Sequence, residues 1–195
     1  MADNHVIYKN GAKEIAFQNG CSITFMAKPF QDWIGNSCHI HLSVVGKGGD
    51  PVMADKKGKH GFSKLMEHWI AGQLATMREL TMFFAPNINS YKRYVEGSFA
   101  PTAVAWGLDN RTCALRVVGH GRSLRVENRV PGGDVNQYLA ISALIAGGLY
   151  GIEHELELEP IFEGNAYVSD APRVPASLRE AAALFADSEV AVEAF

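Results

Sequence analysis

Alternating apolar and polar residues predict several short β-strands along the chain. The alternation runs over residues 21–29, 38–45 and 122–131 and has the two-residue period of a strand that buries one face. Residues 102–119 predict two further strands, joined through Asp109–Asn110 in a hairpin-type turn. The middle of the chain is therefore expected to form a sheet.

Two longer segments change to a period of three and four residues, which is typical of helices. Apolar side chains recur in this way over 62–80 and predict an amphipathic helix of about five to six turns. A second helix is predicted from Asp134 to about residue 152, because Asp134 and Gln137 have capping-box spacing. Its Gly147–Gly148 pair would weaken an isolated helix by about 1 kcal/mol per glycine. The pair therefore indicates close packing against another element.

The remaining segments predict connections and short helices. Residues 1–20 indicate a short helix with a loop, and Asn10–Gly11 and Asn19–Gly20 are turn signals. The Gly- and Lys-rich stretch 46–61 lacks the spacing of a phosphate-binding P-loop, so we interpret it as a surface connection. A short Ala- and Leu-rich helix is predicted from about Ser177.

Composition narrows the class of protein. The 195 residues are enough for one sizeable domain, with 47% hydrophobic and 20% charged residues. The net charge of −3 argues against a general nucleic-acid binder, and no apolar run is long enough to span a membrane. Three cysteines without CxxC spacing argue against a disulfide framework or a structural zinc site. No signal-peptide pattern precedes them, so we expect a reducing, cytoplasmic setting.

Two strand faces carry candidate chemistry. In RSLRVENRVP, Arg125, Glu127 and Arg129 alternate with mostly apolar residues, which places one carboxylate between two guanidinium groups on one face. In CHIHLSVV, His39, His41 and Ser43 share a face in the same way. Each pattern by itself fits either a solvated strand face or a site for a metal ion and a polyanion. The long polar segment 85–101 is a further place for binding residues.

Four motifs in order resemble the glutamine synthetase family, from about Thr24 to the end of the chain. MAKPF with GNSCHIHLS is similar to the family's K-P…G-x-x-H-x-H-x-S block, and NSYKRYVEGSFAP is similar to its N-S-Y-K-R-L-x-P-G-x-E-A-P block. LDNRTCALRV resembles x-x-N-R-S-A-x-x-R, and RVENRVP with the helix after it resembles R-x-E-x-R-x-P-D. The order and spacing of all four make the resemblance specific.

The resemblance implies a fold and a reaction. The implied fold is α+β, with a curved, mainly antiparallel sheet backed by the two long helices. The implied reaction is an ATP-dependent ligation, in which glutamate is activated as γ-glutamyl phosphate and then captured by ammonia or an amine. Such chemistry uses Mg²⁺ or Mn²⁺ to neutralise phosphate charge, and arginines to hold phosphoryl and carboxylate groups. A ring-shaped homo-oligomer, a dodecamer by resemblance, is also implied.

The resemblance also implies residue roles. His39 and Glu127 match the metal ligands. The residues that match ATP contacts are His41, Leu42, Ser43, Arg116, Arg122 and Arg125, with Arg125 also on the phosphoryl group in transfer. The residues that match glutamate contacts are Gly35, Arg93, Arg111 and Arg129. Arg93 and Arg125 are the candidate catalytic residues.

Three departures from the family pattern change the expected acceptor. Phe99 stands where the family has the flap glutamate that binds ammonium, Glu96 replaces the loop proline, and Ile34 replaces an asparagine. A phenyl ring cannot accept a proton, so we expect an amine other than ammonia, such as a polyamine or an alkylamine. Ordinary glutamine synthesis and a catalytically inactive family member with a structural or binding role are the alternatives.

The sequence further resembles only part of the family's catalytic domain. The upstream E-x-E strand, the small N-terminal β-grasp domain and the final helices of the family have no counterpart in these residues. We therefore expect residues 1–195 to be a partial catalytic domain, incomplete at both ends. Without the other metal carboxylates, the 195 residues alone are expected to be inactive.

Overall fold

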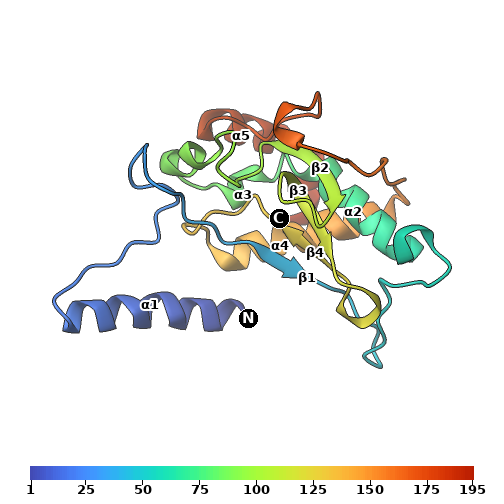
Figure 1. Ribbon diagram of the computed structural model, residues 1–195, viewed down its shortest axis with the longest axis horizontal. Helices are drawn as coiled ribbons and strands as arrows, with labels where there is room; N and C mark the ends of the chain where they lie inside the picture. The colour runs from blue at the N-terminus through green and yellow to red at the C-terminus, as the bar shows by residue number, and fades with distance from the viewer.

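Four short strands form one sheet, in the order β1–β4–β3–β2, in the computed structural model, which describes residues 1–195. The strands are β1 (Ile40–Leu42), β2 (Ala103–Leu108), β3 (Cys113–Val118) and β4 (Arg125–Asn128). β1 and β3 each pair antiparallel with β4, and β2 pairs with β3 (Figure 1). Strands distant in sequence are therefore neighbours, and β4 lies between β1 and β3.

The pairing of β2 with β3 is parallel, so the predicted hairpin at Asp109–Asn110 is wrong. Ala103 lies opposite Cys113 and Leu108 lies opposite Val117, whereas a hairpin would pair the strands antiparallel. The other edge of β2 is covered by the C-terminal tail, where Val104 N donates to Pro172 O and Val174 N donates to Thr102 O. β2 is therefore paired along both edges, with β3 on one side and with a segment distant in sequence on the other.

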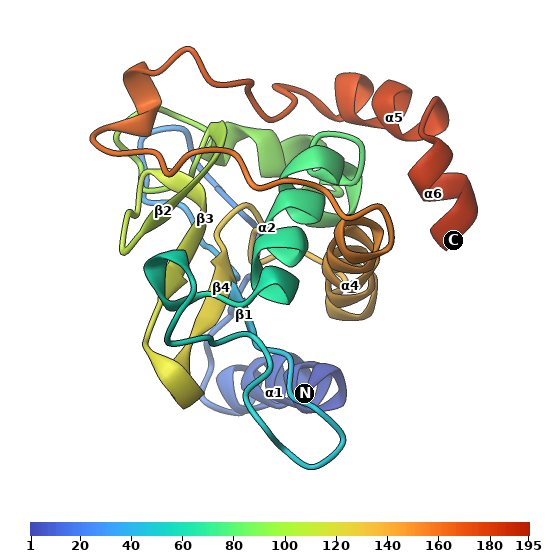
Figure 2. The ribbon, with the colours of Figure 1, turned by 90° about the vertical axis from the view of Figure 1, so that its right-hand side faces the viewer.

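The helices pack behind the sheet. α2 (Lys64–Thr76) lies between the sheet and α4 (Gln137–Glu153), and α5 (Leu178–Ala186) and α6 (Glu189–Ala194) lie at the far end (Figure 2). One continuous core joins strands and helices, and it includes Trp69, Leu115 and Leu144. The result is a mixed α+β fold with a mainly antiparallel sheet backed by long helices, as predicted.

Glycines set the distance between α2 and α4. A Cβ added to Gly148 would lie 2.4 Å from the Trp69 ring, and one added to Gly151 would lie 2.0 Å from His68 O. Both distances are far inside van der Waals contact. The glycines that weaken the helix in isolation therefore allow close helix packing, which confirms the expectation for this segment.

The ends of the helices differ in part from the predicted ones. Ser63 caps α2 by accepting from Met66 N, but α2 ends at Thr76, before the predicted end at residue 80, and a separate short helix, α3 (Thr81–Phe84), follows it. α4 begins at Gln137 with Asn136 as its N-cap, so the predicted start at Asp134 is wrong. Asp134 instead accepts hydrogen bonds from Asn87 and Ser90. Its carboxylate therefore ties the polar segment to the α4 entry.

The N-terminal region also departs from expectation. α1 (Ala2–Gln18) continues through Gly11, so Asn10–Gly11 is not a turn, whereas Gly20 does adopt a turn conformation with φ of 69°. Residues 21–29 form no strand and belong to no sheet, so the predicted strand there is wrong. α1 lies beside the main body (Figure 1) and is held partly by Lys9 Nζ, 2.9 Å from Gly133 O.

Candidate active site

Glu127 is the centre of a charged row that crosses three strands. It lies opposite His41 on β1 and opposite Arg116 on β3. Its Oε2 accepts from Arg116 Nη1 at 2.9 Å, and its Oε1 accepts from Arg129 Nη1 at 2.9 Å. His39 Nδ1 lies 3.1 Å and His41 Nε2 lies 3.6 Å from the same Oε1. The two patterns that alternate on separate strands therefore meet at one carboxylate.

This carboxylate is buried and remains ionised. Only 3% of Glu127 is exposed. Burial alone would raise its pKa, but hydrogen bonds from His39 and Arg116, and the charges of Arg129 and His39, hold the pKa of Glu127 well below its usual range. The pKa of His41 is lowered by burial, an effect that Glu127 partly offsets. The row thus presents a fixed negative charge next to imidazole nitrogens.

A second arginine group lies beside the row. Arg93 is 2% exposed, and its Nη1 donates to Ser37 Oγ at 3.0 Å while Nη2 donates to Val130 O. Its Nε is buried without a partner. Gly35 packs directly on this side chain, because a Cβ there would lie 2.9 Å from Arg93 Cγ. Burial lowers the pKa of Arg93, and the charges of Tyr94 and Asp134 partly offset this.

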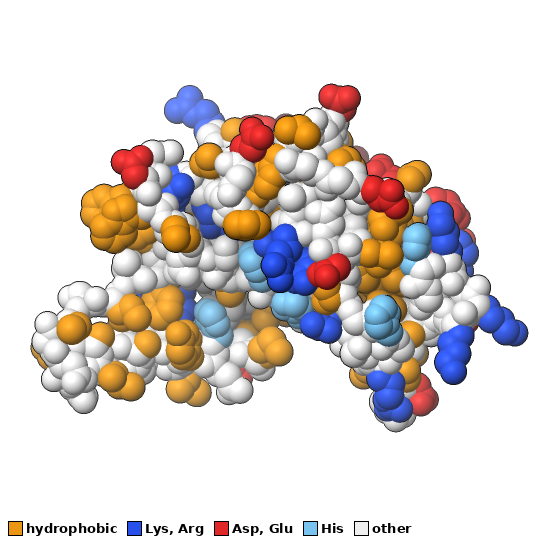
Figure 3. All heavy atoms as spheres, viewed as in Figure 1, with side chains coloured by type: hydrophobic (Ala, Val, Ile, Leu, Met, Phe, Trp, Pro, Cys, Tyr) orange, Lys and Arg blue, Asp and Glu red, His pale blue; other side chains and the backbone are white.

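The structure brings together some of the predicted site residues and leaves others apart. Arg125 Nε lies 3.2 Å from His41 Nδ1, at the exposed end of the row. Arg122 is exposed and donates to Gly49 O, and Ser43 is exposed without a side-chain hydrogen bond. Arg111 is exposed, although its carbonyl oxygen accepts from Arg129 Nε at 3.2 Å. On the face shown in Figure 3, basic (Lys or Arg) and histidine side chains gather over the middle of the sheet.

The geometry of His39 and Glu127 fits a single divalent cation. Two neighbouring ligands of an octahedral ion, each about 2.1 Å from it, lie about 3 Å apart. His39 Nδ1 and Glu127 Oε1 are 3.1 Å apart, and Arg129 Nη1 lies 2.9 Å from the oxygen and 3.5 Å from the nitrogen. A metal ion bound to both atoms would take the place of this guanidinium contact. No group of three or more His, Cys, Asp or Glu side chains is arranged so that it could hold a metal ion.

The residues that depart from the family pattern flank this site. Phe99 O accepts from Arg129 Nη2 at 3.1 Å, while the Phe99 side chain is 64% exposed. The Phe99 backbone has φ of 58°, an uncommon conformation for a bulky residue. Ile34, next to Gly35, is 94% exposed. The loop before β2 therefore brings the Phe99 backbone to Arg129 and leaves Phe99 itself largely exposed.

Sequence reasoning missed three residues that hold this site. Asp109 Oδ1 accepts from Arg116 Nε at 2.8 Å, Ser37 accepts from Arg93, and Asp134 supports the segment that carries Arg93. Asp109 had a sequence signal, since it directly precedes the N-R motif, but we assigned it only to a turn. Asp134 also had a signal, but its spacing to Gln137 indicates a helix cap and not a partner for Asn87 and Ser90. Ser37 had none that distinguishes it from ordinary loop residues.

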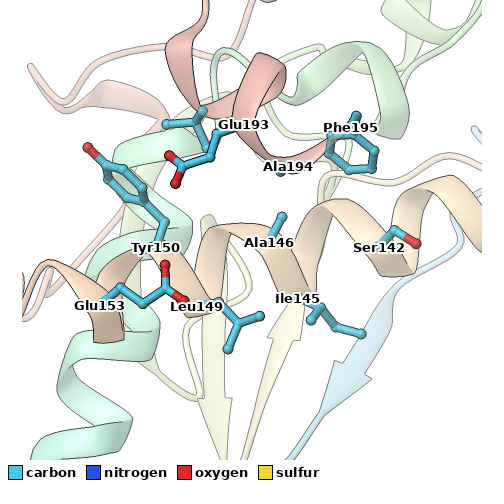
Figure 4. A pocket seen from close by; sticks show the side chains of 10 residues that line it. Ser142, Ile145, Ala146, Leu149, Tyr150, Glu153, Glu193, Ala194 and Phe195 are labelled. Atoms are coloured by element: carbon cyan, nitrogen blue, oxygen red, sulfur yellow. The ribbon is translucent and has the colours of Figure 1, made fainter.

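A separate hollow of the surface lies away from the charged row. It has a volume of about 410 Å³ and lies between α4 and α6, where Ile145, Leu149 and Phe195 contribute apolar walls (Figure 4). Glu153 and Glu193 also line it. None of the residues in the charged row lines this hollow. We place the candidate site on the sheet face, because the carboxylate, imidazole and guanidinium groups of the charged row lie there.

Comparison with known proteins identifies the family. The catalytic domain of glutamine synthetase matches residues 1–195, the whole of the chain. The chain belongs to the glutamine synthetase family. A solved structure of GmaS in complex with ADP superposes with a TM-score of 0.91 at 32% identity, over 99% of this chain and 46% of that one.

Several relatives are amine ligases of this family. A gamma-glutamylethanolamide synthetase of Streptomyces coelicolor is 60% identical over 193 residues, which cover 99% of this chain and 41% of that protein. A glutamate–isopropylamine ligase of a Pseudomonas species is 45% identical, over 97% of this chain and 42% of that protein. A type-1 glutamine synthetase of Dictyostelium discoideum is 43% identical, over 98% of this chain and 38% of that protein. The chain thus spans about two fifths of the length of these relatives.

No helix combines the length and the apolar character that crossing a membrane requires.

Proposed function

We propose that the protein containing this chain is an ATP-dependent ligase that joins the γ-carboxylate of glutamate to an amine other than ammonia. The observation that carries the proposal is the loop of Phe99, whose carbonyl oxygen accepts from Arg129 of the candidate site while the residue is 64% exposed. The family resemblance places a carboxylate at this position to bind ammonium. An apolar ring there favours an amine that carries carbon substituents.

The relatives support the same acceptor class. The sequence identity is 60% to a gamma-glutamylethanolamide synthetase and 45% to a glutamate–isopropylamine ligase. It is 37% to a gamma-glutamylputrescine synthetase of Escherichia coli and 36% to a glutamine synthetase of Pyrococcus abyssi. The two highest values therefore belong to amine ligases.

The residues of the chain supply three parts of the mechanism. His39 and Glu127 would hold one Mg²⁺ or Mn²⁺ ion, which neutralises phosphate charge when bound. His41, Leu42, Ser43, Arg116, Arg122 and Arg125 form the ATP side, and Arg125 also stabilises the phosphoryl group in transfer. Arg93, Arg111 and Arg129, with Gly35 against Arg93, form the glutamate side. Arg93 is buried before any substrate arrives, so its guanidinium is pre-oriented.

The wider setting follows from the family. The protein acts in the cytoplasm as a homo-oligomer, and the remaining metal carboxylates come from parts of the protein other than these 195 residues. We further propose that the chain is a partial catalytic domain and that residues 1–195 alone are inactive.

A panel of acceptors tests the proposal on the intact protein. ADP release is measured with glutamate and ATP in the presence of ammonium, ethanolamine, alkylamines or polyamines. We expect stimulation by at least one organic amine to exceed that by ammonium. Phe99→Glu should raise the ratio of ammonium to organic-amine activity, while Phe99→Leu should leave the preference unchanged. Exclusive stimulation of the unmodified protein by ammonium would refute the proposed acceptor.

Ordinary glutamine synthesis is the second candidate, favoured by the 43% identity to a type-1 glutamine synthetase. It predicts ammonium as the sole acceptor in the same panel. An inactive structural member predicts neither ADP release nor binding of ATP with Mn²⁺, which calorimetry measures directly.

A further inference from the structure

Asp109 extends the charged row beyond the last strand that carries it. The row runs from His41 through Glu127 to Arg116, and Gly107 on β2 lies opposite Arg116. Asp109 follows the end of β2, and its Oδ1 accepts from both Arg116 Nε, at 2.8 Å, and Arg116 Nη2. Glu127 accepts from Arg116 Nη1 on the other side. The guanidinium is therefore held between two carboxylates.

The backbone of Asp109 is held in an uncommon conformation. Its φ is +48°, in the left-handed region that only Gly, Asn and Asp tolerate readily. Its N–H donates to Val117 O at 3.0 Å. The next residue, Asn110, donates from Nδ2 to Gly164 O at 2.9 Å and accepts from Thr112 N. The turn is thus fixed on both sides, so the carboxylate is directed at Arg116 by a rigid support.

These contacts leave part of the Arg116 guanidinium free. An arginine side chain has five N–H donors, and three of those of Arg116 are used by Asp109 and Glu127. One N–H remains on each terminal nitrogen. Arg116 is 16% exposed, whereas the Asp109 side chain is 77% exposed, so the partner that faces solvent is the carboxylate. The arginine is restrained but still has donors for a ligand oxygen.

We infer that Asp109 is a positioning residue, which orients Arg116 to receive a nucleotide phosphate. This inference rests on the proposed function, because it takes Arg116 to be a phosphate ligand. In the absence of Asp109, Glu127 would be the only partner of the Arg116 guanidinium, and Glu127 is also the candidate metal ligand. Asp109 thus orients Arg116 through hydrogen bonds that do not depend on Glu127, the candidate metal ligand.

The sign of the effect separates orientation from simple charge. A carboxylate near a triphosphate repels it, so if Asp109 acted only through its charge, removing it would tighten ATP binding. If Asp109 orients Arg116, removing it weakens ATP binding, because a loose guanidinium must be ordered when the phosphate arrives. The two accounts therefore predict shifts of the ATP dissociation constant in opposite directions.

Asp109→Asn and Asp109→Gly test the inference in the intact protein. Both residues accept a positive φ, and glycine removes the steric cost of the turn, so the fold should be retained. Binding of a non-hydrolysable ATP analogue with Mg²⁺ is measured by calorimetry. The midpoint of thermal unfolding is measured for the same variants. We expect the dissociation constant to rise about five- to tenfold in both variants with no fall in the midpoint, since a largely exposed charge pair is a modest contributor. Asp109→Glu should recover part of the affinity.

Glu155→Gly is the matched control. Glu155 is another exposed acidic residue with a positive φ, of 47°, and it forms no ion pair. This variant removes the same charge and the same backbone strain, and we expect the dissociation constant to stay within twofold.

A double-mutant cycle with Arg116→Ala completes the experiment. If Asp109 acts through Arg116, Asp109→Asn should cause no further loss in the Arg116→Ala background. Unchanged or tighter analogue binding in Asp109→Asn, or an equal loss in both backgrounds, would overturn the inference while leaving the proposed function intact. Absence of analogue binding by the unmodified protein would instead refute the proposed function and the inference with it.

Discussion

The Glu127→Gln substitution tests the central claim that one buried carboxylate holds the site together. The change keeps the volume of the side chain and removes its charge. Glu127 is 3% exposed, and its two oxygens accept from Arg116 and Arg129. Arg129 is also 3% exposed, so its charge would lose its partner in a buried position. The cost falls mainly on Arg129, because Arg116 keeps Asp109.

The magnitude follows from the burial of the pair. Removing one partner of a buried ion pair typically costs about 3–5 kcal/mol. The glutamine amide retains one acceptor oxygen, so we expect the lower end, about 3 kcal/mol at pH 7. Urea unfolding of the intact protein measures this, with Glu163→Gln as the control, since Glu163 is exposed and outside the row. The control should change stability by less than about 0.5 kcal/mol.

The pH dependence gives an independent check. The pKa of Glu127 lies well below its usual range in the folded protein. Its contribution to stability is therefore fully present above the unfolded pKa of about 4.3 and is lost as the pH falls toward the folded pKa. The stability difference between the unmodified protein and Glu127→Gln should shrink by about 1.4 kcal/mol per pH unit below about pH 4.3. A loss under about 1 kcal/mol at pH 7, or a difference that stays constant down to pH 3, would refute this reasoning.

Three further substitutions or treatments probe the scaffold. Gly151→Ala should destabilise the protein by about 1–3 kcal/mol, because its new Cβ meets backbone of the facing helix. The same change at Gly11, where no atom lies within 4 Å, should cause no loss in chemical denaturation, since alanine favours a helix. Ser63→Ala should cost about 1 kcal/mol by removing the N-cap of α2; no measurable change would show that the cap is dispensable. Thiol alkylation at pH 8 should modify exposed Cys21 well before Cys113, because burial raises the pKa of Cys113 to about 11; equal rates would contradict the burial.

Local pattern was sufficient for the elements whose side chains follow one simple period. The alternation in RVENRVP placed Arg125, Glu127 and Arg129 on one face, and the structure gathers them around His41 on β1 and His39 just before it. The glycine pair in α4 indicated close helix packing, because glycine inside a helix is costly unless a neighbour needs the space. These inferences depend on spacing along the chain alone.

Pattern failed where the backbone partner lies far away in sequence. Residues 21–29 alternate like a strand, but alternation reports which face is buried and not whether another strand offers hydrogen bonds. Asp109–Asn110 has the composition of a hairpin turn, yet β2 and β3 pair in parallel and the tail covers the other edge of β2. Asp134 has capping-box spacing, but its carboxylate accepts hydrogen bonds from Ser90 and Asn87. Asn136 is the N-cap of α4 instead.

The sequence by itself determined the chemical content of the site: which strand faces carry imidazole, carboxylate and guanidinium groups, and which family they resemble. Only the tertiary structure decided which of these groups share a partner. Strand order β1–β4–β3 places His41, Glu127 and Arg116 in one row, and the turn after β2 adds Asp109 to its end. The physical reason is that side-chain direction follows from local backbone geometry, whereas cross-strand neighbours depend on long-range pairing that no local spacing specifies.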